Sequence, residues 1–324
     1  MEAQHHRCQN EHEAKALKAQ REKHLNVIID EQLSYSGCIN NAVQFPSNYL
    51  SLTIDGMECT HIPHHVPPIK KWMHKNKRYG LQVFGIMDHG HHNVIYYYPA
   101  HAYSKGSNAI ISILYTHLQQ YISQPDHAPV LYLQADNCYG ENKNRMVLAF
   151  LSFLVAKKIF TNIYYHFLPA GHTHADVDQM FSVLRQSMDT SKCIELPSEM
   201  VQVWSNSYQD RQQQPDIIEV PRMYDWKTWF EQVMNDMRDH INPRAFHFHC
   251  TGSGKAVFKV KSSATRGNWS EEYCLLDYLP ASSPIILEPR HMSDQGFSEI
   301  MLTLQGELIS PVSLHTWQSI LAKS

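Results

Sequence analysis

The stretch APVLYLQADN, residues Ala128–Asn137, has the pattern of a buried β-strand that ends at an acidic residue. It lies between two segments with the apolar spacing of helices, Ser107–Ser123 and Glu141–Phe160. A strand that is flanked by helices on both sides joins its sheet through crossover connections, which make neighbouring strands parallel. This stretch therefore predicts an α/β fold in which part of the sheet is parallel.

The segments around this strand extend the same pattern. Upstream, Tyr49–Cys59 predicts one strand, and Arg78–Ala100 predicts two strands around a His/Gly turn. Downstream, Thr161–Pro169 predicts another strand and Thr173–Met188 another helix. Three strands in an antiparallel meander, followed by parallel strands with crossover helices, are the order of a ribonuclease H-like mixed sheet. In that order the first and fourth strands are parallel neighbours.

The rest of the chain is predicted to lie outside this core. We divide it into an N-terminal helical segment (1–48), the core (49–210) and a small C-terminal α+β appendage (211–324). Good helix formers predict a helix over about Glu11–Leu33, and Pro221–Ile241 has a helical and aromatic pattern. Short strand-like runs follow: Phe246–Cys250, Lys255–Ser262, Glu271–Leu279 and Ser298–Leu304.

Composition indicates a globular protein with a sizeable core. The chain has 324 residues, 43% of them hydrophobic and 18% charged, and its net charge of -3 lacks the basic excess typical of nucleic-acid-binding proteins. The seven cysteines are odd in number and form no CxxC motif, which is typical of a reduced intracellular protein. The start has no apolar signal region, and the longest apolar run, Met146–Ala156, is too short to span a bilayer. We therefore expect no membrane partner.

Two predicted strands of the core end at aspartates, Asp55 and Asp136. Because these strands are predicted to be parallel neighbours, their carboxyl ends would place both side chains at the edge where open α/β sheets bind ligands. Two adjacent carboxylates repel each other unless a cation lies between them. A pair of Mg²⁺ or Mn²⁺ ions, about 3.5–4 Å apart, would satisfy them and is suited to phosphodiester chemistry.

The stretch LPAGHTHADVDQMF, Leu168–Phe181, supplies a third acidic group. On a helix that begins near Thr173, Val177 and Phe181 lie on the face that packs against the sheet. Asp178 lies beside Phe181, whereas Asp176 lies on the opposite edge. Asp178 is therefore the predicted third ligand, and Asp176 is the reserve.

Three blocks of this sequence resemble a family. IDG (Ile54–Gly56), ADNCYGENKN (Ala135–Asn144) and GHTHADVD (Gly171–Asp178) look like an uncharacterised eukaryotic transposon-derived domain family that is similar to DDE/D transposases. The resemblance covers roughly Tyr49–Asp210. It implies a ribonuclease H-like core in which three acids hold two Mg²⁺ ions, which activate water or a 3′-hydroxyl to attack a DNA phosphate. It also implies a DNA partner, either transposon ends or genomic DNA, a nuclear location, and possible homo-oligomers.

The resemblance implies roles for individual residues. The predicted catalytic and metal-binding residues are Asp55, Asp136 and Asp178. The residues expected around them are Asn137, His172, His174 and Asp176. Ribonuclease H proper has a glutamate on its first helix, but Ser107–Ser123 contains no acidic residue, which matches the three-acid layout of transposases.

The loop KKWMHKNKR, Lys70–Arg78, is a candidate for contacting nucleic acid. Its basic residues can hold a phosphate backbone. Such a loop is also often simply solvated, and both readings remain open. The residues concerned are Lys70, Lys71, Lys75, Lys77 and Arg78.

Other readings of the same residues remain open. Asp55 fits a turn at the end of a strand, Asp136 and Asn137 fit a helix cap, and the two histidines of GHTH fit structural roles. The turn Met87–His92 is predicted to be only a hairpin turn. A silent transposon relic that serves as a DNA-binding or interaction module is the main alternative. A metallophosphoesterase that uses GHTH is a weaker one, because the other motifs of that family are missing.

Overall fold

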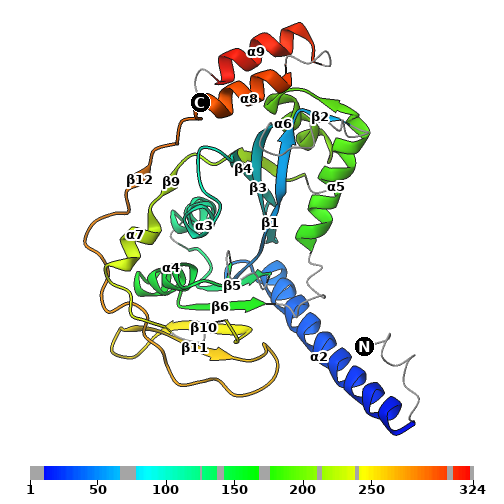
Figure 1. The fold of residues 1–324 in the computed structure, drawn as a ribbon. Coiled ribbons are helices and arrows are strands. Elements are labelled where there is room, and N and C mark those ends of the chain that lie inside the picture. Colours follow the sequence, from blue (N-terminus) through cyan, green and yellow to red (C-terminus); the bar gives the residue numbers. More distant parts are fainter. Residues whose placement is uncertain are drawn as a thin grey trace.

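The computed structural model describes residues 11–65, 78–124, 126–136, 142–167, 176–209, 214–237, 241–304 and 309–321. The described residues form one large sheet of eight strands in the order β11-β10-β6-β5-β1-β3-β4-β8, with helices on both faces (Figure 1). Among the described residues, no helix combines the length and the apolar character that crossing a membrane requires.

The centre of the sheet has the predicted strand order. β1 (Tyr49–Ile62), β3 (Tyr79–His89) and β4 (Val94–Pro99) form an antiparallel meander. β5 (Val130–Ala135) runs parallel to β1, and β6 (Asn162–Phe167) runs parallel to β5. The prediction that the first and fourth strands of the core are parallel neighbours is therefore confirmed.

Strands from the C-terminal part of the chain extend this sheet at both ends. β8 (Asp216–Glu219) pairs with β4 in parallel. β10 (Ala245–Cys250) pairs with β6, and β11 (Ala256–Lys261) pairs with β10. Without them, β4 and β6 would be edge strands with unpaired backbone groups. These parts of 211–324 therefore belong to the main sheet rather than to an appendage.

One face of the sheet is covered by α3 (Ser107–Ile122), α4 (Arg145–Ala156) and the short α7 (Trp226–Glu231). Their apolar side chains pack with the inward residues of β1, β5 and β6 in a cluster that we call the first core. Nine of the twelve residues of α4 are buried in it, which explains why the helix is apolar on nearly all sides.

The opposite face carries α5 (Asp176–Ser191) and α6 (Pro197–Asn206), and α8 (Asp294–Leu304) and α9 (Pro311–Leu321) pack beyond them (Figure 1). Their apolar side chains join the other face of β1, β3 and β4 in a cluster that we call the second core. The strand predicted for Ser298–Leu304 is wrong, because this run is helical. Its buried members, Ile300, Met301 and Leu304, have a helical spacing that a short run cannot distinguish from a strand.

The N-terminal helix α2 (Glu11–Gln44) begins as predicted but continues well beyond Leu33. Its C-terminal part packs against β1 and β3, and its N-terminal part projects from the body of the molecule (Figure 1). The helix predicted over Pro221–Ile241 is much shorter, since α7 is the only helix among the described residues of this range. The run Glu271–Leu279 forms isolated bridges instead of a strand.

Two small sheets complete the described structure. β2 (His64–His65) pairs with β7 (Cys193–Ile194), and β9 (Met223–Tyr224) pairs with β12 (Ile286–Leu287). The second pair ties the segment before α7 to the segment that leads towards α8.

Candidate functional site

Two of the predicted site residues follow directly after paired residues of neighbouring strands. The last pair between β1 and β5 joins Ile54 to Ala135, and the next residue on each strand is an aspartate, Asp55 and Asp136. Parallel strands lie about 4.8 Å apart. The two aspartates therefore occupy equivalent positions at the point where β5 ends.

The residue paired with Asp55 shows on which face of the sheet the Asp55 side chain lies. Asp55 pairs with Gly85 of β3, so the two residues point to the same side. A Cβ atom at Gly85 would lie 2.5 Å from the Cε atom of Met180 and 2.9 Å from the ring of Phe181. Asp55 thus lies on the face that α5 covers, and Asp178 belongs to the helical turn just before Phe181.

A buried asparagine holds the second aspartate. The side-chain amide of Asn142 donates to Oδ1 of Asp136. Asn142 is 2% exposed, and its backbone carbonyl accepts a hydrogen bond of 2.8 Å from the hydroxyl of Tyr165. Our sequence reasoning missed this residue, although it lies within the quoted ADNCYGENKN block. Asn142 restricts the orientation of the Asp136 carboxylate.

Asp176 is held by residues of three other elements. The hydroxyl of Tyr35 in α2 donates to its Oδ1 atom at 2.6 Å, and Nδ1 of His89 lies 3.5 Å from its Oδ2 atom. Thr53 of β1 contacts both the Tyr35 hydroxyl and Nε2 of His89, at 2.7 and 3.1 Å. Burial, and next the charge of Asp176, raise the pKa of Tyr35 far above its ordinary value. The Tyr35 hydroxyl therefore stays protonated and fixes Asp176 over β1.

A buried lysine lies at the same edge of the sheet. Lys143 has no solvent exposure, and its Nζ atom lies 4.8 Å from the centre of the Phe167 ring. Phe167 is the partner of Ala135 across β5 and β6, so this ammonium is one strand away from Asp136. Burial, together with the charge of Arg244, lowers the pKa of Lys143 to about 8. No local pattern in the sequence predicts that this lysine is buried.

The lowered pKa of Lys143 predicts a dependence of stability on pH. Between about pH 8 and the ordinary lysine value of 10.5, the unfolded chain binds more protons than the folded chain. The stability contributed by neutral Lys143 is therefore complete above pH 10.5 and is lost as the pH falls through about 8. We expect the difference in free energy of unfolding between the parent protein and Lys143→Met to increase from about pH 8 to pH 10.5. Urea denaturation of both proteins over this pH range measures the difference.

The exposed Lys227 provides the control for this measurement. Its side chain is 61% exposed, so Lys227→Met makes the same chemical change at the surface and is measured over the same pH range. A flat difference for Lys143→Met would contradict the lowered pKa.

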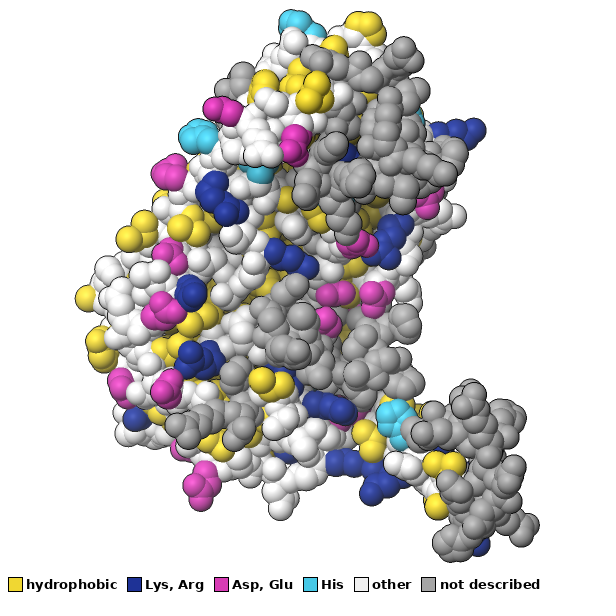
Figure 2. Space-filling model, viewed as in Figure 1, with side chains coloured by type: hydrophobic (Ala, Val, Ile, Leu, Met, Phe, Trp, Pro, Cys, Tyr) yellow, Lys and Arg dark blue, Asp and Glu magenta, His cyan; other side chains and the backbone are white. Residues whose placement is uncertain are grey.

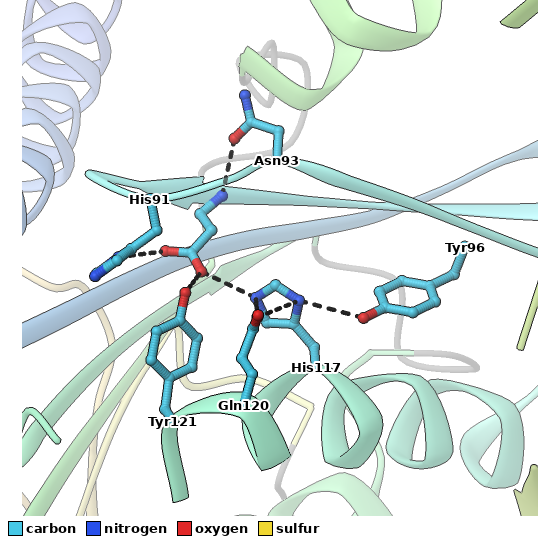
Figure 3. Close-up of polar contacts among 7 residues, drawn as sticks. His91, Asn93, Tyr96, His117, Gln120 and Tyr121 are labelled. Atoms are coloured by element: carbon cyan, nitrogen blue, oxygen red, sulfur yellow. Dashed lines mark hydrogen bonds and ion pairs between the residues drawn. The ribbon is translucent and has the colours of Figure 1, made fainter. Parts of the chain in front are cut away.

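A second polar cluster surrounds Asp88 at the end of β3 (Figure 3). The Asp88 side chain has no solvent exposure, and it contacts Nε2 of His117 at 3.0 Å and Nδ1 of His91 at 3.1 Å. It also accepts a short hydrogen bond from the hydroxyl of Tyr121. Burial alone would raise the pKa of Asp88, but the hydrogen bonds from His117 and His91 outweigh it and hold the pKa below its ordinary value. Asp88 is therefore a buried carboxylate with a full set of donors.

The hairpin turn that carries Asp88 was predicted to be only a turn, but its residues make contacts on both faces of the sheet. Asp88 points to α3 on one face of the sheet, whereas the next residue, His89, contacts Thr53 and Asp176 on the other face. The turn Met87–His92 thus connects the buried cluster to the aspartates near α5. In the sequence, the only sign of these contacts was a group of histidines that follows one aspartate.

Several predicted site residues lie outside the described residues. They are Asn137, His172, His174, Lys70, Lys71, Lys75 and Lys77. Of the predicted nucleic-acid loop, the structure describes Arg78, which directly precedes β3.

The chemistry of the aspartate pair can be compared with that of a metal site. Carboxylate oxygens are the ligands that Mg²⁺ and Mn²⁺ prefer, so the donors at Asp55 and Asp136 fit these ions. In the part of the chain that the structure describes, no three or more His, Cys, Asp or Glu side chains are grouped to hold a metal ion. A complete set of three carboxylates, with Asp178 as the third, stays a prediction.

The fold defines the class of the protein, and the comparison with known families defines its place in that class. A large mixed sheet with helices on both faces is an α/β architecture. The family described as "Domain of unknown function (DUF7869)" matches residues 71–266, more than half of the chain, and the protein belongs to this family. No curated protein and no solved structure matches the chain.

Proposed function

We propose that this protein is a transposase-derived domain with a ribonuclease H-like core that cleaves or transfers DNA strands with the help of divalent metal ions. One observation carries the proposal. Asp55 and Asp136 occupy equivalent positions on neighbouring parallel strands where β5 ends, and the first turn of α5, with its two aspartates, packs on the face of Asp55. This is the arrangement in which acidic residues from separate segments serve one site.

The strand order supports the same proposal. The order β4-β3-β1-β5-β6, with a meander followed by parallel strands, is the order expected of a ribonuclease H-like core. The strands β8, β10 and β11 then extend that core at its two ends.

Each residue of the site has a role in this proposal. Asp55 and Asp136 would share the metal ions, with Asp178 as the third ligand. When bound, such ions lower the pKa of an attacking water or hydroxyl and stabilise the leaving oxygen. Asn142 holds the carboxylate of Asp136 in one orientation. Lys143 supplies a positive charge one strand away, which favours the approach of a phosphate.

A non-catalytic DNA-binding or interaction module is the second candidate. One observation favours it. Asp176, the reserve ligand, is already engaged by Tyr35 and His89. In this case the aspartates would serve the fold and not a reaction.

The variant Asp136→Asn tests the proposal. The change keeps the shape of the side chain and removes its charge. We expect the parent protein to bind Mn²⁺ in calorimetry and to cleave linear DNA when Mg²⁺ is present. Because loss of a supporting residue already costs about 10–100-fold in metal affinity, loss of a ligand should cost more. DNA binding should persist or tighten slightly, since a negative charge facing phosphate is removed.

Two further variants make the test specific. Asn142→Ala should weaken Mn²⁺ binding by about 10–100-fold if Asn142 orients Asp136. Asp216→Asn, at the exposed start of β8, should behave like the parent protein. Binding of Mn²⁺ that survives in Asp136→Asn would contradict the proposed site. A parent protein that binds DNA but no metal would instead identify the non-catalytic module.

A further inference from the structure

A pocket of about 530 Å³ lies between the end of β1, the start of β3, the segment after β4 and the start of α8. Its volume is in the range typical of small-molecule sites. Cys59, on its wall, is about 13 Å along β1 from Asp55 at 3.3 Å per residue. None of Asp55, Asp136 and Asp178 lines this pocket. The pocket is therefore separate from the aspartate site.

Five of the residues that line this pocket have basic side chains. They include two guanidinium groups, those of Arg78 and Arg290, and three imidazoles. Among the described residues that line it, none is Asp or Glu. The imidazoles belong to His61, His101 and His291. Like charges around a pocket repel each other, so this arrangement does not stabilise either hydrophobic core.

Arg78 has a buried donor that lacks an acceptor. Its Nε atom is buried and has no hydrogen-bond partner in the described structure. A buried donor without an acceptor costs free energy that an anion in the pocket would recover. Arg78 is half-buried, burial lowers the pKa of its guanidinium, and no ion pair between it and a carboxylate is found in the described residues.

Arg290, in the segment between β12 and α8, lines the same pocket. Its backbone N–H donates to the carbonyl of Ala102 at 3.0 Å, and its Nε atom donates to the same carbonyl at 3.4 Å. These two contacts hold the arginine in place. Burial, and next the charge of Arg290, lower the pKa of His101.

The start of α8 also lines the pocket, and Asp294 is the acidic residue of its first turn. Ser293 and Gly296 line the pocket, and the Ser293 hydroxyl accepts from the N–H of Gly296 at 3.1 Å, which caps the helix. The N-terminus of an α-helix carries a partial positive charge and favours anions. The pocket is thus lined by two arginines, three histidines and the N-terminus of α8.

We propose that this pocket binds a terminal phosphate group, carried either by a free nucleotide or by the 5′ end of a nucleic-acid strand. The fork of a guanidinium matches two phosphate oxygens, and two arginines suit a doubly charged phosphate. Tyr79 and Ile300, which are 5% and 4% exposed, provide an apolar wall for the organic part of the ligand. The inference does not rest on the proposed function, because the pocket contains neither Asp55 nor Asp136.

Calorimetry on the full chain tests this inference. The probes are AMP, sodium phosphate, and one short single-stranded oligonucleotide with and without a 5′-phosphate. We expect phosphorylated probes to bind, and Arg78→Met and Arg290→Met each to weaken binding by at least about tenfold, since each removes a charge-assisted hydrogen-bond partner. Arg266→Met should bind like the parent protein, because the Arg266 guanidinium already pairs with Asp30.

The outcomes separate the two sources of phosphate and can overturn the inference. Binding of AMP that is lost in the arginine variants identifies a free nucleotide. Binding of only the 5′-phosphorylated oligonucleotide identifies a strand end. Equal binding of both oligonucleotides, binding unaffected in Arg290→Met, or no binding of any probe overturns the proposal.

Two features keep these outcomes interpretable. Arg290 is exposed, so its variant should fold even if Arg78→Met does not. Asp136→Asn should keep phosphate binding in full, which separates this pocket from the aspartate site.

Discussion

The Asp88→Ala variant is expected to lose about 3–5 kcal/mol of its free energy of unfolding, the range typical when one partner of a buried ion pair is removed. The Asp88 carboxylate has no solvent exposure and contacts His117, His91 and Tyr121. Its removal leaves these donors without their shared acceptor inside the protein. Water cannot replace that acceptor at His117, which is also fully buried.

Urea denaturation at neutral pH measures this loss. Asp216→Ala is the matched control, since Asp216 is exposed and its replacement should change stability by less than about 0.5 kcal/mol. Asp88→Asn keeps the shape of the side chain and should fall between Asp88→Ala and the parent protein. If Asp88→Ala lost no more than the control, the cluster would contribute nothing to stability.

The Gly85→Val variant is the second prediction with a large effect. A Cβ atom at this position would lie 2.5 Å from Met180 and 2.9 Å from the Phe181 ring, and valine adds two methyl groups beyond it. Overpacking of this kind costs about 1–3 kcal/mol. Because the strain is relieved by moving α5 away from β3, the first turn of α5 should also move relative to Asp55. We therefore expect both a lower melting temperature and weaker Mn²⁺ binding.

Gly37→Ala provides the contrast for this variant. Gly37 lies within α2, and a Cβ atom there would meet nothing within 4 Å. Alanine should stabilise this helix by about 0.5–1 kcal/mol, because glycine is unfavourable inside helices. Thermal denaturation of both variants compares the two effects. Equal melting temperatures for Gly85→Val and the parent protein would show that α5 does not pack closely on β3.

The centre of the sheet could be predicted because its sequence signals are local. Each strand of the core contains an apolar run, and the helices between Pro99 and Ser191 are marked by their apolar residues. Crossover connections then determine which strands are parallel. This is why the equivalent places of Asp55 and Asp136 on neighbouring strands could be predicted from their position in the chain. The prediction that the first strand ends at Asp55 is wrong, because β1 continues to Ile62 through its pairing with β3.

Other features depend on contacts between distant segments and could not be predicted. Tyr35 and Asp176 are separated by 141 residues, yet they share a hydrogen bond. Lys143 and Asp88 are polar residues whose burial is decided by what packs around them. β8 and β10 join the sheet because its edges need partners, and no local pattern states which edge each strand will pair with.

The length of β1 has a consequence for how the molecule holds together. The strand has 14 residues, and only those from Tyr49 to Ile54 pair with β5. Leu50, Leu52 and Ile54 belong to the first core, whereas Met57 and Ile62 belong to the second. Neither core can come apart without loosening a strand that the other one needs, so the two faces form a single cooperative unit. Asp55 lies between these two sets, and a ligand bound there would stabilise both cores at once.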